Sequence, residues 1–454
     1  ANRAGRHTDH LSEFDRRSLA AFTDHLEGRI QVAERAYRDL VSDYPSRLDA
    51  RVLLTLLLAQ YDPLRGRPLD EVMDLLGRID EADAEYFCLQ CVTRQVTGTR
   101  QDAPGMAENW LRAVEANPDS ASREAHLPMA SAVYSLAHGD TAAFSRARRE
   151  VIPQLDVDHS PIFALSWTAV MLGQTALADT LARVDLAPLE YSEHAYEGLL
   201  GAMDFVRGRW NDAGGRIQRS FELDPDVSLL SWISGWALNV PLEARLDGLE
   251  TARARCLAWD GRVSGSDAVT WQVLAPHIRL FGAALMSLQA DDGPRALALA
   301  DSLEALPTDS VYLPPIRNAV RLVRGEAALL DGDNAAAMRI LEGLEWEMSP
   351  PAALVNRRLG ASRAQLVLAE AAWRTGDQTT SRRWLENGLT AWQINDYALR
   401  EIRLGQVSEE LGDREQARIH YARVVEALEP ADDELVPRRD AAQARLVALM
   451  AGEG

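Results

Sequence analysis

Residues 404–421 read LGQVSEELGDREQARIHY, a sharp turn between two segments of helical character. Gly412 lacks a Cβ, so it can adopt the left-handed conformation that commonly ends a helix. Asp413 follows it and offers a carboxylate to the free amides at the start of the next helix. Ala417 is small enough for the second helix to pack closely against the first. The stretch therefore predicts a pair of helices joined by a short turn.

The same turn pattern recurs along the chain. Clear copies read GRIQVA at 28–33, GQTALA at 173–178, GRWNDA at 208–213, GDNAAA at 332–337 and GDREQA at 412–417. Looser copies begin at Gly139 and Gly376, and weaker candidates lie near Gly66, Gly98, Gly248 and Gly293. A proline, which cannot continue a helix, often closes the unit, as at Pro45, Pro118, Pro225 and Pro430. Turns spaced roughly 32 to 45 residues apart predict an array of helix pairs in which each pair packs on its neighbours.

The pattern resembles the tetratricopeptide repeat, which has Leu-Gly in its first helix, then the glycine turn, an alanine, an aromatic residue and a proline. The last clear unit matches at Leu404, Gly405, Gly412, Ala417, Tyr421 and Pro430. Two further units match at Leu200, Gly201, Gly208, Ala213, Ile217 and Pro225, and at Gly28, Ala33, Tyr37 and Pro45. The resemblance implies an all-α fold: an α-solenoid that forms a right-handed superhelix of about ten helix pairs.

The chain also resembles the repeat arms of bacterial serine/threonine kinases and of multidomain transcriptional regulators, through residues 33–45, 61–68 and 412–446. This resemblance implies a sensory or regulatory arm. It favours a soluble, cytoplasmic protein, or an extracytoplasmic one if the chain is the tail of a membrane receptor kinase.

The repeat pattern divides the chain into three parts. Residues 1–226 and 321–454 carry the clearer repeats, and residues 227–320 fit the pattern poorly. The middle part contains Trp232, Trp236, Trp259 and Trp271. Trp232 and Trp236 are four residues apart and so share one face of a helix. They predict either a ligand platform, because tryptophans carry much of the binding energy at interfaces, or bulky residues in a thicker core.

Composition excludes several classes of function. The net charge of -20 disfavours nucleic acid as the main partner, because phosphate binding needs a basic face. All 48 basic residues are arginine, so the lysines of a P-loop, a protein kinase or a pyridoxal enzyme are missing. No apolar run is long enough to span a membrane, which predicts no direct membrane insertion.

No motif predicts chemistry, so we expect no enzyme activity, no catalytic residue, no cofactor and no metal. Cys88 and Cys91 have a C-x-x-C spacing, but no second pair completes a zinc site, and we expect buried core cysteines. Asp156, Asp158 and His159 could supply metal ligands, but groups at an inter-helix turn more often cap helices. Arg65 and Arg67, in the proline-rich stretch 61–68, either meet an acidic partner, or are solvated or pair with the nearby Asp70 and Glu71.

A stack of helix pairs has a concave groove lined by the first helix of each pair. In two units the groove positions hold Arg363, Leu366 and Glu370, and Leu399, Ile402 and Gln406. This set does not reproduce the Lys, Asn and Arg clamp with which some of these repeats hold a carboxylate tail. We therefore expect a scaffold whose groove takes an amphipathic or basic protein segment. The expected binding residues are Trp232, Trp236, Arg363, Glu370 and Gln406. The alternative is a small-molecule sensor domain of a signalling protein, with its pocket at the two tryptophans.

Overall fold

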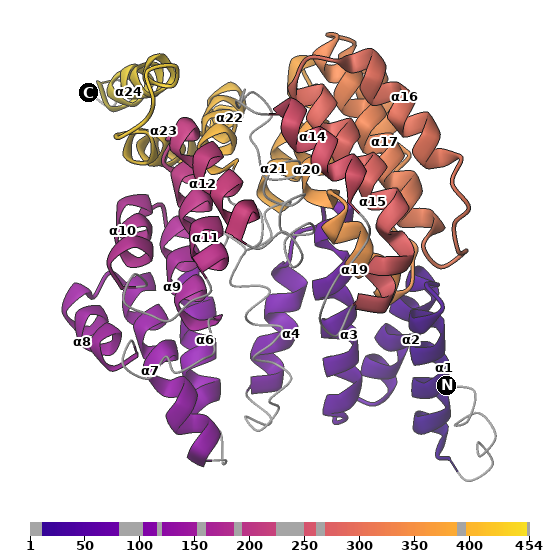
Figure 1. The fold of residues 1–454 in the computed structure, drawn as a ribbon. Coiled ribbons are helices and arrows are strands. Elements are labelled where there is room, and N and C mark those ends of the chain that lie inside the picture. The colour runs from indigo at the N-terminus through magenta and orange to yellow at the C-terminus, as the bar shows by residue number, and fades with distance from the viewer. Residues whose placement is uncertain are drawn as a thin grey trace.

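The computed structural model describes residues 11–80, 103–115, 120–151, 160–185, 193–223, 249–259, 268–387 and 396–451. Every regular element in these ranges is a helix, and most helices are arranged as consecutive pairs joined by short turns (Figure 1). The all-α solenoid expected from the sequence is therefore confirmed.

Each helix pair contains a first and a second helix that run along each other. The pairs are α1 (Glu13–Leu26) with α2 (Ile30–Asp43), α3 (Leu48–Tyr61) with α4 (Asp70–Asp80), α7 (Ser120–Ala137) with α8 (Thr141–Val151), α9 (Ser160–Met171) with α10 (Thr175–Thr180), α11 (Glu193–Val206) with α12 (Trp210–Leu223), α15 (Ala268–Gln289) with α16 (Gly293–Glu304), α17 (Leu313–Leu330) with α18 (Asn334–Glu342), α20 (Ala361–Arg374) with α21 (Gln378–Asn387), and α22 (Tyr397–Glu410) with α23 (Arg414–Ala427). The other described elements are η2 (Pro63–Arg65), α6 (Ala103–Glu115), the π-helix η4 (Leu181–Asp185), α14 (Leu249–Ala258), α19 (Pro350–Arg358) and α24 (Val436–Ala451).

The turn glycines adopt the backbone conformation that the sequence pattern requires. Gly412 has a φ of 79°, and Gly28, Gly66, Gly139, Gly173, Gly208, Gly332 and Gly376 also have positive φ. Between α15 and α16 the left-handed residue is Asp291, with a φ of 57°, rather than the candidate Gly293, which is the first residue of α16. The candidates Gly98 and Gly248 lie outside the described residues.

The Leu-Gly position of the repeat has a steric reason in the last unit. A Cβ on Gly405 would lie 2.7 Å from the ring of Tyr421 on the partner helix. Tyr421 is almost fully buried, and burial raises the pKa of its phenol to about 12. Glycine at this position therefore lets the two helices approach closely around an aromatic core residue.

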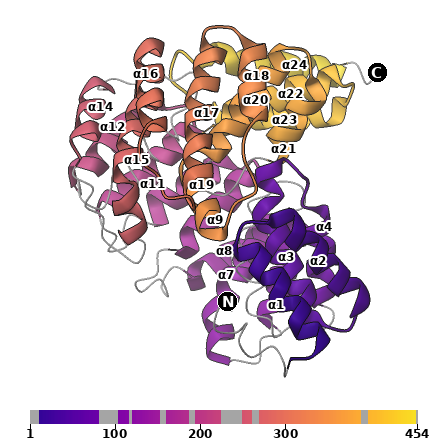
Figure 2. The same cartoon turned by 90° about the vertical axis from the view of Figure 1, so that its right-hand side faces the viewer.

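The array folds back on itself, so that helices of its second half lie over helices of its first half (Figures 1 and 2). One core unites buried residues between Phe14 and Ile79 with Met348, Ala352, Ala353 and Ala361. A second core runs from Ala107 to Leu449. We call the zone where the turns of the first half meet residues 344–435 the seam.

The turns at Gly28, Gly66, Gly173 and Gly208 form the first-half side of the seam. A Cβ on any of these glycines would lie within 2.8 Å of an atom of the second half. The contacts pair Gly28 with Met348, Gly66 with Trp384, Gly173 with Arg423 and Gly208 with Leu428. The order of the contacts is the same in both halves, so the two halves run in the same direction along the seam.

The part of the chain expected to diverge continues the helix-pair pattern where it is described. α15 has 22 residues, and its stretch from Phe281 to Gln289 is buried. Trp259 packs partly buried against the core, whereas Trp232 and Trp236 lie outside the described residues. The division at residues 226 and 320 stays a prediction. Within the described ranges, no helix is both long enough and apolar enough to cross a bilayer.

Candidate functional site

Arg363, expected in the groove, lies inside the protein. Its guanidinium donates hydrogen bonds of 2.7 and 2.6 Å to the two carboxylate oxygens of Glu326 on α17, and neither side chain is more than 2% exposed. Burial alone would lower the pKa of Arg363, but the charge of Glu326 outweighs it and raises this pKa. The expectation that Arg363 faces a partner is therefore corrected: it joins two neighbouring repeats from within.

Glu370 and Gln406, the other two described binding candidates, meet at one arginine. Arg403 on α22 donates to both carboxylate oxygens of Glu370 on α20, at 2.8 and 2.7 Å, and also donates to Gln406. Arg374, one turn after Glu370, donates to the same carboxylate at 2.8 Å. The sequence pattern thus identified two members of a real cluster but missed Arg403, its centre.

An aromatic ring completes this cluster. The guanidinium carbon of Arg403 lies 3.2 Å from the ring centroid of Trp373 on α20, a cation–π stack. Trp373 and Gln406 are half-buried, and so are the neighbouring apolar residues Leu366 and Ile402. We call Leu366, Glu370, Trp373, Ile402, Arg403 and Gln406 the α20–α22 face.

The α20–α22 face combines charged, polar and apolar side chains and has no group suited to catalysis. Its ionised groups, Arg403 and Glu370, pair with each other, Arg374 at its edge shares the same carboxylate, and none of its side chains is a nucleophile beside a base. Across the described ranges, no three His, Cys, Asp or Glu side chains come together as a metal site. Cys256 is buried, which raises the pKa of its thiol to about 12, while Cys88, Cys91 and residues 156–159 lie outside the described residues.

A cleft of about 480 Å³ opens on the seam beside α2 and η2. It is lined by Gln31, Arg65, Arg67, Leu344, Glu345, Trp346 and Glu347. Arg65 donates to Glu34 at 2.9 Å and to Glu347 at 3.2 Å, and Arg67 donates to Glu34 at 3.3 Å. Both arginines of the stretch 61–68 therefore pair with carboxylates, but with Glu34 and Glu347 instead of Asp70 and Glu71.

Asp62 lies buried beside this cleft. Its side chain is 5% exposed, the nearest nitrogen of Arg67 is 3.5 Å away, and one carboxylate oxygen accepts no hydrogen bond from the described residues. Burial raises the pKa of Asp62 to about 6. Glu34, also desolvated, behaves in the opposite way: hydrogen bonds from Arg38 and Arg65 outweigh the burial and lower its pKa.

The chain shows only distant similarity to known proteins. No protein-family model matches the chain, and no curated protein matches it. Among solved structures, the Cut9–Hcn1 hetero-tetramer of the APC/C aligns over 96% of both chains at 12% identity and a TM-score of 0.30. Yeast Tom70 aligns over 97% of both chains at 12% identity and a TM-score of 0.29. Naa15/Naa10 bound to HypK-THB aligns over 97% of this chain and 78% of that one, at 12% identity and a TM-score of 0.25. Likenesses of this degree assign neither a family nor a function.

Proposed function

We propose that this protein is a non-enzymatic scaffold of tetratricopeptide-like repeats that binds an amphipathic segment of a partner protein on the α20–α22 face. The observation that carries the proposal is the stack of Arg403 on Trp373, held in place by two hydrogen bonds to Glu370.

Fixed side chains support binding because less conformational entropy is lost when a partner docks. Arginine and tryptophan are the residue types that dominate the binding energy of protein interfaces. Here both are anchored by contacts between two neighbouring repeats, so the face exists before a partner arrives. The half-buried Leu366 and Ile402 add apolar surface beside the stack.

The composition of the face favours an amphipathic partner. Leu366, Trp373 and Ile402 suit apolar side chains spaced along one face of a helix. Arg374 and Arg403 exceed Glu370 by one charge, so an acidic residue on the partner would be attracted. A basic segment, the other occupant expected from the sequence, suits this face less well.

Affinity capture with matched variants tests the proposal. The double variant Trp373→Ala/Gln406→Ala removes the stacking ring and one polar contact without touching the buried Arg363–Glu326 pair. We expect a protein captured by the wild type to lose at least about tenfold in affinity for this variant, as hot-spot truncations of 1.4 kcal/mol or more produce.

Arg149→Ala on the exposed surface of α8 is the control and should bind like the wild type. A partner that binds the wild type and the double variant with equal affinity would rule out the α20–α22 face as its site.

A second candidate function is that of a small-molecule sensor, and the cleft at Trp346 favours it. The side chains of Arg67 and Glu347 are each about half exposed there, next to a half-buried indole. A ligand with one anionic and one cationic group beside an apolar part would match these three side chains. A thermal-shift screen of such zwitterions should give a rise in Tm that Trp346→Ala abolishes. A rise that persists in this variant would place the ligand elsewhere.

A further inference from the structure

The turns that join the two helices of a pair fall into two classes according to the residue that follows the left-handed one. Asp follows at Gly139, Asp291, Gly332, Gly376 and Gly412, whereas Arg or Gln follows at Gly28, Gly66, Gly173 and Gly208. The second set is the same as the set of turns that dock at the seam. For the first class, a Cβ on Gly139, Gly332, Gly376 or Gly412 would meet no atom within 4 Å.

Turns of the Asp class cap their own second helix. In each, a carboxylate oxygen of the aspartate accepts the amide three residues later, as Asp333 does from Ala336 at 2.9 Å. The other pairs are Asp140 with Ala143, Asp292 with Arg295, Asp377 with Thr380 and Asp413 with Gln416. For Asp377 this amide hydrogen bond is the main reason for a lowered pKa.

Three turns of the other class receive their cap from the second half of the chain. Arg29 and Gln174 precede α2 and α10, and neither side chain makes a capping hydrogen bond. The amide of the second helical residue instead donates to a distant carboxylate in each of the three helices. The pairs are Gln31 with Glu347 at 3.3 Å, Ala176 with Glu426 at 2.7 Å, and Asn211 with Asp432 at 3.0 Å.

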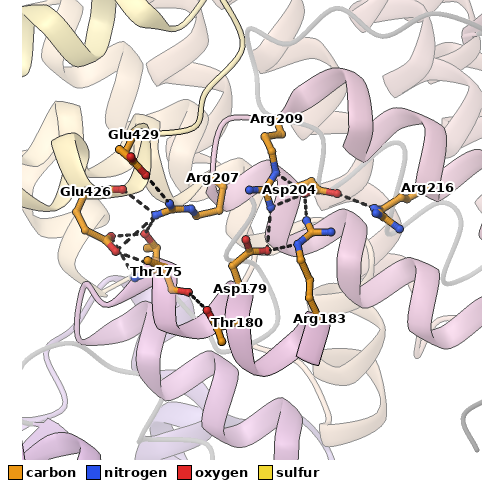
Figure 3. A network of polar contacts seen from close by, with 11 residues as sticks. Thr175, Asp179, Thr180, Arg183, Asp204, Arg207, Arg209, Arg216, Glu426 and Glu429 are labelled. Carbon is orange, nitrogen blue, oxygen red and sulfur yellow. Dashed lines mark hydrogen bonds and ion pairs between the residues drawn. The ribbon is translucent and has the colours of Figure 1, made fainter. Parts of the chain in front are cut away.

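The cap on α10 is the most elaborate (Figure 3). Glu426 also accepts the amide of Thr175 at 3.1 Å and the Thr175 hydroxyl. Arg207, which is 4% exposed, donates to the backbone carbonyl of Glu426 at 2.7 Å and to Glu429 at 3.4 Å. Burial lowers the pKa of Arg207, so this arginine depends on the seam for its counter-charges.

The remaining contacts reach the backbone carbonyls of two turn glycines, one from a backbone amide and one from the side-chain amide of Asn387. The amide of Asp432 donates to the carbonyl of Gly208 at 3.0 Å, and Asn387 donates to the carbonyl of Gly66 at 3.1 Å. Left-handed glycines without side chains allow this approach. The turns with Arg or Gln after the glycine are therefore built to receive another part of the chain.

We propose that the seam is a latch: Glu347, Glu426 and Asp432 hold the folded-back array closed by capping α2, α10 and α12, and removal of these caps opens it. Charged caps suit such a device because each contributes modestly. They act beside buried apolar residues that the two halves share, such as Met348 and Ala352 with the core of α1 to α4, so loss of the caps should open the seam locally, around α10 and α12, while the helix pairs stay folded.

Two single variants test the latch by hydrogen–deuterium exchange of the full chain. Glu426→Gln removes the capping charge. Gln174→Asp gives the turn at Gly173 the sequence of a self-capped turn, so α10 keeps a cap while the added carboxylate repels Glu426. We expect exchange of the Asp432 amide, followed in peptides covering residues 428–435, to be at least about tenfold faster in both variants, the change that 1.4 kcal/mol produces.

Glu415→Gln is the matched control, because Glu415 is an exposed residue of the same helix as Glu426 and pairs with Arg418. Its exchange should stay within about twofold of the wild type. Unchanged exchange at residues 428–435 in both test variants would overturn the latch. Loss of the helical circular-dichroism signal in Gln174→Asp would also overturn it, because a self-capped α10 should leave both halves folded.

Discussion

The backbone amide of Ala176 donates to a carboxylate oxygen of Glu426 at 2.7 Å, although 250 positions separate the two residues. The first turn of α10 is therefore completed by a side chain of a repeat near the C-terminal end of the array. Equivalent aspartates at other turns lie next to the helix that they cap, as Asp413 does for α23. The local cap of the repeat has become a long-range contact at three of the four turns where Arg or Gln replaces the aspartate.

The two turn classes should respond differently to alanine at the capping position. Asp333→Ala removes the only side-chain cap of α18 that the structure describes and should cost about 1 kcal/mol of unfolding free energy. Arg29→Ala leaves the Glu347 cap on α2 and removes only exposed ion pairs with Asp24 and Glu27, so it should cost under about 0.5 kcal/mol. Urea unfolding measures both values, and an equal loss in the two variants would contradict the assignment of the caps.

Removal of one partner of the buried Arg363–Glu326 pair should lower the free energy of unfolding much more than replacement of both partners by apolar residues. Arg363→Ala leaves a buried carboxylate without its partner and should lower the unfolding free energy by about 3–5 kcal/mol. Arg363→Met/Glu326→Leu, which removes both charges, should lose much less, because apolar residues of similar volume pack in the same space. A double variant as unstable as Arg363→Ala would show that the pair stabilises the repeats by more than charge compensation.

Alanine in place of a helical glycine should lower or raise the stability of the protein according to what surrounds the glycine. Gly405→Ala places a Cβ 2.7 Å from the ring of Tyr421 and should cost about 1–3 kcal/mol despite the better helix propensity of alanine. Gly215→Ala, on an exposed part of α12 where a Cβ meets nothing within 4 Å, should stabilise by up to about 1 kcal/mol. Thermal unfolding of both variants shows whether each substitution raises or lowers the stability. Stabilisation by Gly405→Ala would show that α22 and α23 can move apart to admit the methyl group without a loss of packing energy.

Asp62 should make the protein more stable as the pH falls toward the pKa of this carboxyl. Burial raises its folded pKa to about 6, above the ordinary aspartate value of 3.8, so its protonated form is favoured in the folded state. This contribution is fully present below the unfolded pKa and is lost as the pH rises through about 6. Asp62→Asn should therefore be more stable than the wild type at pH 7.5, by roughly 1–3 kcal/mol.

The advantage of Asp62→Asn should shrink toward pH 4, because the wild-type carboxyl is then protonated as well. Unfolding free energies of both proteins at pH 4 and pH 7.5 give the comparison. A difference between them that does not change with pH would contradict the raised pKa.

The sequence predicted the helix pairs because their determinants are local. A left-handed glycine, a following aspartate and a nearby alanine act within a few residues of one another, and the turn at Gly412 forms as its sequence indicates. Asp291 was missed because the left-handed position there is occupied by an aspartate two residues before the candidate Gly293.

The candidate site was predicted less well because its partners come from other repeats. The sequence placed Arg363 on the groove, but Glu326, 37 positions earlier, holds it inside the protein. Arg403 was missed although it joins Glu370 to Gln406. The seam did leave a signal: the residue after the glycine is Arg or Gln at each docked turn and Asp at each open one. The residue after one glycine does not by itself show that a turn docks; the difference between docked and open turns emerges only when the repeats are compared.

Closure of the array is tested most directly by a disulfide across the seam. Asn211 and Asp432 are 221 positions apart, yet their side chains are 3.1 Å from each other. Under mild oxidation, Asn211→Cys/Asp432→Cys should form an intramolecular disulfide that peptide mapping identifies, whereas Asn211→Cys/Asp333→Cys, with its second cysteine at an open turn, should not. Absence of the 211–432 disulfide in the folded protein, or its formation only between molecules, would contradict the closed array.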